Sequence, residues 1–286
     1  MLRACLIMLA NLQRYHRPST LSEAITALKQ TPDTTAVLAG GTHLIETGSD
    51  SITDLVDITH LGLDFIRRDA SQICIGATTS LQQIIDSSVI QQVADGILAT
   101  ACRMTTVSRM RRNVSTIGGE VVAAAPSSGV TVALLALGAR LCVVGDFEQT
   151  VSLDTFYEEA PQPLRGAIIT EVVIPSPPPQ TRAAFLSLGA IASSLPIIHV
   201  GAMVALQPIG CQIARLAVGA ATRKPMRLAS AEALLIGHKL DEATINEAAA
   251  AAAASIDPID DVRASATYRR QMCRVLVRRA LEQLRQ

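Results

Sequence analysis

The sequence predicts an α+β fold, with two successive α/β units and a C-terminal unit of three strands and helices. Three observations predict it. Nearly half of the 286 residues are apolar, yet there is no Trp, with three Tyr and four Phe, so aliphatic side chains must fill the interior between layers of helices and sheets. Short apolar runs alternate with helical patterns through the first two units. A proline run then precedes three further strand-like stretches.

The first unit, residues 1–62, is expected to begin with a capped helix in the segment 19–28. A serine or threonine at its start can accept the free amide bonds of a first helical turn, and apolar residues then recur at helical spacing. A short buried strand is expected over 36–39, ended by Gly40-Gly41. A second strand is expected over 54–58.

The second unit, residues 63–175, is expected to continue the alternation. Ser80 is placed to cap a helix that contains Leu81, Ile84 and Ile85. The other expected elements are a strand over 72–76, a helix over 93–104, a basic turn at Arg109, Arg111 and Arg112, an apolar segment ending over 131–137, and a strand over 140–144.

The proline run over 175–179 marks a boundary, because consecutive prolines fit neither a helix nor the interior of a sheet. The third unit, residues 180–286, is expected to contain strands over 184–188, 197–206 and 213–218, followed by helices over 229–235, 243–255 and 266–284. The last helix is amphipathic and carries five arginines. A solvated surface is the favoured interpretation of that arginine face, and a subunit contact is the alternative.

Composition excludes several classes of function. The 25 basic residues balance the 25 acidic ones, so no basic field is available to bind nucleic acid. Six cysteines lie far apart without a CxxC pair, so we expect no metal site. The apolar run near the N-terminus is too short to span a bilayer, and no signal cleavage site is evident. We therefore expect a cytoplasmic protein without a membrane span.

Two double glycines are the most informative motifs: Gly40-Gly41, followed by Thr42, and Gly118-Gly119, preceded by Thr116-Ile117. Consecutive glycines permit positive φ and close approach to a ligand. Their N–H groups can converge on phosphate oxygens, so two such turns could hold a diphosphate from both sides. Neither turn has the GxGxxG or GxxxxGK[ST] spacing. No catalytic acid–base pair stands out, and a free-standing enzyme for a small substrate is disfavoured.

Motifs along almost the whole chain resemble the FAD-binding subunit of the xanthine dehydrogenase and carbon monoxide dehydrogenase family of molybdenum hydroxylases. The resemblance is carried by Tyr15-His16-Arg17-Pro18, Leu38-Ala39-Gly40-Gly41-Thr42, Ile75-Gly76-Ala77-Thr78-Thr79, Arg112-Asn113-Val114-Ser115-Thr116-Ile117-Gly118-Gly119, Ala133-Leu134-Leu135-Ala136-Leu137 and the segment from Asp257 to Arg270. It implies a two-part, PCMH-type FAD-binding domain, followed by three antiparallel strands and helices like those of the carbon monoxide dehydrogenase flavoprotein C-terminal domain.

The resemblance also implies the cofactor, the partners and the site. The cofactor is FAD. The partners are a [2Fe-2S] subunit, which delivers electrons, and a large molybdopterin-binding subunit, which oxidises the substrate; NAD, oxygen or a quinone then accepts the electrons. The implied cofactor-binding residues are Val37, Leu38, Ala39, Gly40, Gly41, Thr42, His43 and Leu44 in the first turn, Thr116, Ile117, Gly118, Gly119 and Glu120 in the second, and Thr106, Gly129, Ile169 and Ser187 elsewhere.

The sequence departs from the family pattern at side-chain contacts. Glu120 and Ala123 stand where asparagines are usual, Gly129 replaces an aspartate, and Ser187 replaces a lysine. Glu120 beside a diphosphate adds repulsion unless it points away. Two hypotheses follow: a flavin-binding electron-transfer subunit that relies on backbone donors, or a divergent scaffold that keeps the fold and binds FAD weakly or not at all.

Overall fold

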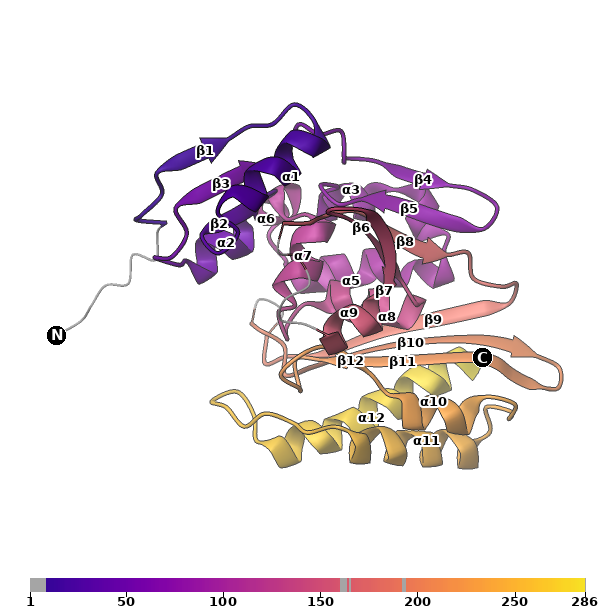
Figure 1. Cartoon of the computed structure of the whole chain (residues 1–286). Coiled ribbons are helices and arrows are strands. Elements are labelled where there is room, and N and C mark those ends of the chain that lie inside the picture. Colours follow the sequence, from indigo (N-terminus) through magenta and orange to yellow (C-terminus); the bar gives the residue numbers. More distant parts are fainter. Residues whose placement is uncertain (1–8, 160–163, 165, 192–193, 286) are drawn as a thin grey trace.

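The computed structural model describes residues 9–159, 164, 166–191 and 194–285, and contains three sheets that follow one another along the chain (Figure 1). The first eight residues, which hold most of the N-terminal apolar run, lie outside the described residues. Within the described ranges, no helix combines the length and apolar character needed to cross a membrane.

The first sheet has three parallel strands in the order β1 (Arg14–His16), β3 (Asp54–Asp57) and β2 (Thr35–Leu38). Helix α1 (Leu21–Gln30) begins as predicted, because the Thr20 hydroxyl accepts the backbone N–H of Glu23 at 3.2 Å. Its apolar face buries Ala24, Ile25 and Leu28. The short helix α2 (Thr42–Thr47) follows the first glycine pair directly.

One expectation for this unit was wrong in detail, and one strand was not predicted. The strand expected to be buried over 36–39 is β2, which begins at Thr35 and is only partly buried, with Val37 37% exposed. As an edge strand of a small sheet, it has no neighbour on one side. The polar strand β1 was not predicted; an ion pair from Arg14 and a hydrogen bond from His16 to the buried Asp54 stabilise it.

The second sheet is antiparallel, in the order β4 (Ile66–Arg68), β5 (Gln72–Gly76), β8 (Ile168–Pro175), β6 (Arg140–Val144) and β7 (Glu148–Ser152). The strands expected over 72–76 and 140–144 are confirmed. The central strand β8 is the last of the five in sequence, so the sheet forms between segments that are far apart along the chain.

Helices cover one face of this sheet. Ser80 caps α3 (Leu81–Asp86) in a complete capping box with Gln83, as the pattern predicted. The remaining helices are α4 (Ser88–Gln91), η1 (Ala94–Gly96), α5 (Ile97–Thr105), α6 (Arg109–Val114), α7 (Ile117–Ala123), α8 (Gly129–Leu137) and α9 (Leu153–Glu159).

The helix expected over 93–104 begins only at Ile97. Asp95 and Gly96 have φ values of 53° and 68°, which interrupt a right-handed helix before that point. The basic turn expected at Arg109, Arg111 and Arg112 was also wrong, because these residues form α6. Ser108 caps that helix by accepting the Arg111 amide.

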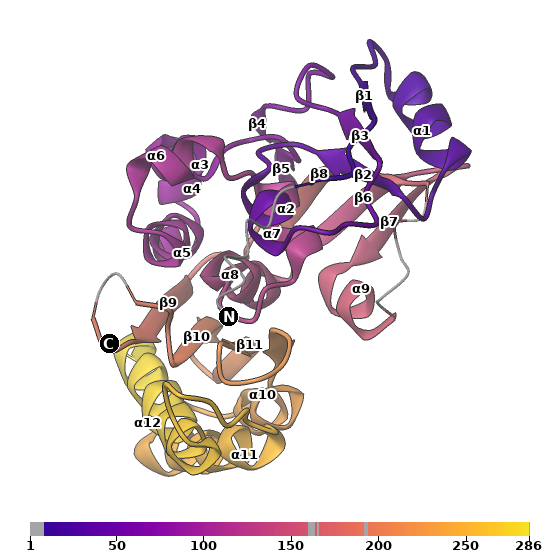
Figure 2. The same ribbon diagram turned by 90° about the vertical axis from the view of Figure 1, so that its left-hand side faces the viewer.

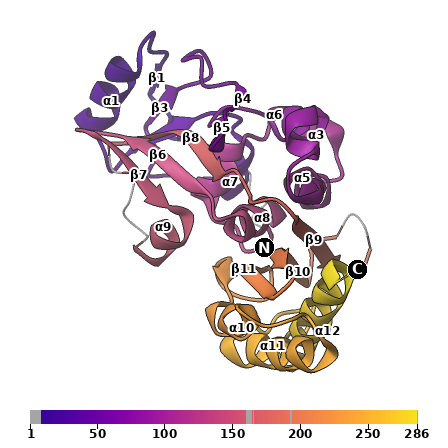
Figure 3. The ribbon, with the colours of Figure 1, turned by 90° about the vertical axis from the view of Figure 1, so that its right-hand side faces the viewer.

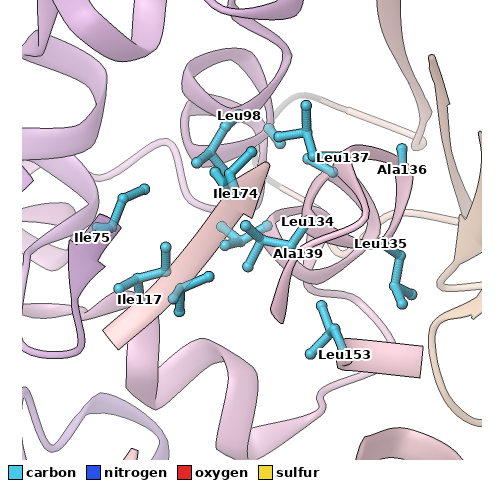
Figure 4. Close-up of a cluster of buried hydrophobic side chains, with 14 of the residues drawn as sticks. Ile75, Leu98, Ile117, Leu134, Leu135, Ala136, Leu137, Ala139, Leu153 and Ile174 are labelled. Carbon is cyan, nitrogen blue, oxygen red and sulfur yellow. The ribbon is translucent and has the colours of Figure 1, made fainter. Parts of the chain in front are cut away.

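The main core lies between the second sheet and its helices. Figure 4 shows side chains from β5, α5, α7, α8 and β8 converging, including Ile75, Leu98, Ile117, Leu134 and Ile174. Every residue of α8 is buried. The cause is that α8 contacts β10 and β11 of the third sheet on its other side (Figures 2 and 3).

The third sheet is antiparallel. The three predicted strands are β9 (Thr181–Leu188), β10 (Ile198–Gln207) and β11 (Gly210–Gly219), and a two-residue strand, β12 (Met226–Arg227), joins the edge beside β11. Helices cover the face opposite α8 (Figure 1): α10 (Ala229–Leu235), α11 (Glu242–Ser255) and α12 (Ala266–Arg285).

The amphipathic character predicted for α12 is confirmed. Its buried face includes Cys273, Leu276 and Leu284, while one arginine, Arg269, is wholly buried. The Arg269 guanidinium donates to the Ile197 and Ala220 carbonyls and pairs with Asp261 at 2.7 Å. The other arginines of the helix are exposed: Arg270, Arg274, Arg278, Arg279 and Arg285.

Candidate functional site

A cleft of about 670 Å³ lies where the first and second units meet, within the size range of small-molecule and cofactor sites. The first unit contributes β2, the first glycine turn and α2. The second contributes the start of α7, the segment up to Pro126, and the beginning of β8. The walls are mostly apolar, with Leu28, Val37, Ile58, Val122 and Ile169 among the lining residues.

The first glycine turn has the geometry that the sequence predicted. Gly41 has a φ of 70°, in the left-handed region that favours glycine. Gly40 is packed so closely that an added Cβ would lie 1.7 Å from the Val114 carbonyl oxygen. Within the described part of the chain, no hydrogen bond occupies the backbone N–H of Gly40 or Gly41. Both glycines line the cleft, so these donors are available to a bound ligand.

The second glycine pair corrects the expectation of a turn that offers free amides. Gly118 and Gly119 belong to the first turn of α7, and neither has a positive φ. The Gly118 amide donates to the Ala77 carbonyl at 2.9 Å, and the Gly119 amide to the Thr116 hydroxyl at 3.2 Å. Because these amides already have acceptors, the second glycine pair lines the cleft without offering backbone donors to a phosphate.

Close packing explains the glycine at 118. A Cβ there would lie 2.8 Å from the Ala77 carbonyl oxygen and 2.9 Å from the Ala77 Cβ, contacts too short for any larger residue without movement. Gly119 faces the cleft, where an added Cβ would meet only the Thr116 hydroxyl, at 3.0 Å. Helix α7 can therefore lie directly against the end of β5.

Polar contacts hold α2 against α6 and α7. Ser115 Oγ donates to Thr42 Oγ1 at 3.2 Å, and Arg111 pairs with Glu46 at 2.5 Å. A third contact joins His43 Nε2 to Glu120 Oε1 at 3.0 Å. The two glycine pairs are thus fixed on one cleft, although they come from different units.

Glu120 points away from the cleft. Its side chain is 4% exposed and accepts hydrogen bonds from Ser128 Oγ at 2.6 Å and from His43. The bond to Glu120 raises the pKa of His43 above its ordinary value, although partial burial of the imidazole acts in the opposite direction. Both oxygens of Glu120 are therefore engaged by protein side chains outside the lining of the cleft or at its edge.

Comparison with known protein families identifies this architecture. Residues 10–177, more than half of the chain, match the family described as the FAD binding domain in molybdopterin dehydrogenase. The chain belongs to this family. Residues 185–284 match the CO dehydrogenase flavoprotein C-terminal domain. The two matches confirm the predicted family, the α+β fold, FAD as the cofactor of the family, and the oxidoreductase class of the subunit.

Known members of the family resemble the chain along its length. It is 27% identical over 277 residues to the carbon monoxide dehydrogenase medium chain of Afipia carboxidovorans, covering 94% of this chain and 95% of the relative. Identity to the 6-hydroxypseudooxynicotine dehydrogenase complex subunit alpha of Paenarthrobacter nicotinovorans is 30%, with coverage of 92% and 90%. A chain of carbon monoxide dehydrogenase from Hydrogenophaga pseudoflava superposes with a TM-score of 0.89 at 26% identity, covering 95% and 96%.

Most of the residues that the resemblance places at FAD line the cleft of this family member: Val37, Ala39, Gly40, Gly41, Thr42, His43, Leu44, Thr116, Gly118, Gly119 and Ile169. Three others are not part of the lining. Leu38 lies beside Gly41, Ile117 is fully buried in the core, and Glu120 is buried against Ser128. Direct contact of any of them with FAD stays a prediction.

The last three predicted residues, Thr106, Gly129 and Ser187, also lie outside the cleft lining. They come from neighbouring segments. An added Cβ at Gly129 would lie 2.8 Å from the Phe185 ring and 3.1 Å from Thr105 Oγ1. Ser187 is on the same strand as Phe185 and pairs with His199. The start of α8, the end of α5 and β9 therefore lie close to one another.

Several lining residues were not predicted: Leu28, Pro32, Thr35, Ala36, Thr47, Ile58, Ala77, Val122, Ala123, Ala125, Pro126, Leu164, Gly166, Ala167 and Ile168. They are mostly small or apolar, and nothing in the sequence separates such residues from those of the core. Ala123 was noted only as a departure from the family pattern.

The described residues contain no cluster of side chains arranged to bind a metal ion. Within those ranges, no group of three or more His, Cys, Asp and Glu side chains is placed to hold an ion. The described cysteines are all free thiols: Cys74, Cys102, Cys142, Cys211 and Cys273. Burial raises the pKa of Cys273 to about 12, which keeps this thiol protonated.

Proposed function

We propose that this chain holds FAD in the cleft between its first two units and serves as the electron-transfer subunit of a molybdenum hydroxylase. The observation that carries the proposal is the shared cleft: two glycine pairs from separate units border one apolar space of cofactor size. The open amides of Gly40 and Gly41 suit the diphosphate. The apolar walls suit the flat rings, and FAD itself supplies the redox chemistry when bound.

The route of the cofactor follows the lining. The first glycine turn would hold the diphosphate, and Gly119 and Pro126 are among the lining residues available to the rest of FAD. Thr106, Gly129 and Ser187 would then contact the isoalloxazine. Support for this assignment is that an added Cβ at Gly129 would lie beside Phe185, two residues before Ser187, and beside Thr105, which precedes Thr106.

The finer assignments belong to the same proposal. A [2Fe-2S] subunit supplies the electrons, after a large molybdopterin-binding subunit has oxidised the substrate. NAD, oxygen or a quinone accepts them. The three units have the bounds 1–62, 63–175 and 180–286, and the complex is cytoplasmic. The medium-chain relatives, which the chain matches over nearly its full length, support a place in a complex of several subunits.

The test is a titration of the purified chain with FAD, followed by flavin fluorescence and absorbance. Saturable binding is expected. The variant Ala123→Trp fills the cleft at an exposed lining residue, so it should abolish binding while leaving the fold intact. Ala254→Trp, at an exposed alanine of α11, is the matched control and should bind normally. A colourless protein that ignores FAD would refute the proposal.

A scaffold that keeps the fold while binding FAD weakly is the second candidate. It is favoured by the composition of the cleft, in which His43 is the sole ionisable side chain among the described lining residues. Binding of the iron–sulfur subunit in a pull-down by a chain that fails to take up FAD would select this candidate.

A further inference from the structure

The cleft has an unusual electrostatic composition for a site that takes a diphosphate. Among the lining residues that the structure describes, none is a lysine or an arginine. His43 is the single side chain there that can carry a positive charge. It is the second residue of α2, immediately after Gly41 and Thr42, and therefore lies beside the two unpaired amides of the glycine turn.

Hydrogen bonds determine which nitrogen of His43 remains without a protein partner among the described residues. Glu120 accepts from Ser128 Oγ through Oε2 and is bonded to His43 Nε2 through Oε1. A carboxylate with two acceptor oxygens fits this pattern, so Nε2 carries the proton. The other nitrogen, Nδ1, has no hydrogen-bond partner anywhere in the described ranges. When the ring is protonated, Nδ1–H is a free donor beside the cleft.

The charges around the imidazole favour its protonated form. Helix α7 contributes Glu120, α6 contributes Arg111, and α2 itself contributes Glu46. Arg111 and Glu46 are paired with each other at 2.5 Å, so their opposing effects on His43 largely cancel. The bond to Glu120 is the largest influence and raises the pKa of His43. A phosphate beside the ring would raise the pKa further.

We propose that His43, held by the buried carboxylate of Glu120, donates from Nδ1 to a phosphate of the ligand and makes its capture dependent on pH. This inference rests on the proposed binding of FAD and identifies a charged contact among the described residues of that site. The sign follows from the protonated form: affinity is highest at low pH and falls as the pH rises through the raised pKa of His43. Glu120 is then a positioning residue, which orients the ring without touching the ligand.

The experiment measures the dissociation constant of FAD from pH 5.5 to pH 9 by fluorescence. Riboflavin, which lacks phosphate, serves as the second ligand. For the wild-type chain, FAD affinity should fall by about tenfold across this range, the worth of one charge-assisted hydrogen bond. Riboflavin affinity should stay level. His43→Gln should remove the slope for FAD and leave its affinity at the high-pH value of the wild type.

Two further variants separate charge from structure. His43→Lys keeps a positive charge across the whole range, so FAD should bind with little dependence on pH. His238→Gln is the matched control, because His238 is an exposed histidine outside the cleft lining, and it should reproduce the wild-type slope. Thermal unfolding of each variant checks that the fold is intact.

Two outcomes would overturn the inference: the same slope in His43→Gln, or an equal slope for riboflavin. The proposed function fails separately if FAD does not bind at any pH. In that event, inorganic pyrophosphate and the NMR titration of the His43 imidazole decide. A pyrophosphate-induced rise in the His43 pKa upholds the phosphate contact, and an unmoved titration curve removes it as well.

Discussion

The two glycine pairs look alike in the sequence and differ in the structure. In each pair, the first glycine is required by a close approach: Gly40 to the Val114 carbonyl and Gly118 to Ala77. The second members diverge. Gly41 has a positive φ and an unpaired amide, whereas Gly119 is helical and donates to Thr116. A doubled glycine therefore identifies a crowded backbone, and only its hydrogen bonds reveal whether it can bind an anion.

The largest effect is expected for Gly40→Ala. The new Cβ would lie 1.7 Å from a backbone oxygen, which cannot rotate away. Overpacking usually costs about 1–3 kcal/mol, and this collision should exceed that range or prevent folding. Urea unfolding gives the measurement. Gly119→Ala, where the nearest atom belongs to a side chain, is the control. Equal stability of the two variants would break the distinction between first and second glycines.

A smaller loss is expected for Gly118→Ala. Its Cβ would lie 2.8 Å from the Ala77 carbonyl oxygen, so α7 must shift by a few tenths of an ångström. We expect a loss of about 1–3 kcal/mol in the free energy of unfolding. A variant as stable as the wild type would show that α7 does not need this close approach to β5.

The second glycines can be compared directly. Gly41→Ala should cost about 1–2 kcal/mol, because alanine resists the left-handed backbone that Gly41 adopts at a φ of 70°. Gly119→Ala should change stability by under about 1 kcal/mol, since the helical gain of alanine offsets its tight contact with Thr116. Chemical denaturation of both variants in parallel tests this, and a reversed order would contradict the assigned backbone geometries.

A pH-dependent effect is expected for the ion pair between α2 and α7, which joins His43 to Glu120. Because the folded-state pKa of His43 lies above the unfolded value of 6.5, its contribution to stability is complete below pH 6.5 and is lost as the pH rises through the folded pKa. The wild type should thus exceed Glu120→Gln by about 1 kcal/mol at pH 6, and by less at pH 9. A difference that grows with pH would contradict the assigned pair.

Local patterns predicted those parts of the fold that local chemistry determines. Thr20 and Ser80 cap helices because their hydroxyls accept hydrogen bonds from amides three residues ahead. Such short-range capping patterns can be recognised in the sequence alone. The strand β1 was missed because Arg-Tyr-His is polar, and its pairing with β3 depends on contacts to a distant acidic residue, Asp54. A contact between residues so far apart in the sequence leaves no periodic pattern from which a strand could be predicted.

The candidate site shows the same limit. The first glycine turn and His43 were identified from local chemistry and resemblance, and both border the cleft. The pairing of the Gly118 amide with Ala77 depends on a segment some forty residues earlier, and the pairing of His43 with Glu120 spans 77 positions. The apolar lining contributed by β8 resembles ordinary core, so its role emerges only when the strand is in place.

The position of β8 has a consequence for biosynthesis. This strand forms the middle of the second sheet, between β5 and β6, and its first residues, Ile168 and Ile169, line the cleft. Pairing between such remote segments is slow to form, and domains emerge from the ribosome N-terminus first. Translation must therefore pass Pro175 before β8 can complete the lining of the cleft. Loading of a cofactor is thus a late event in maturation.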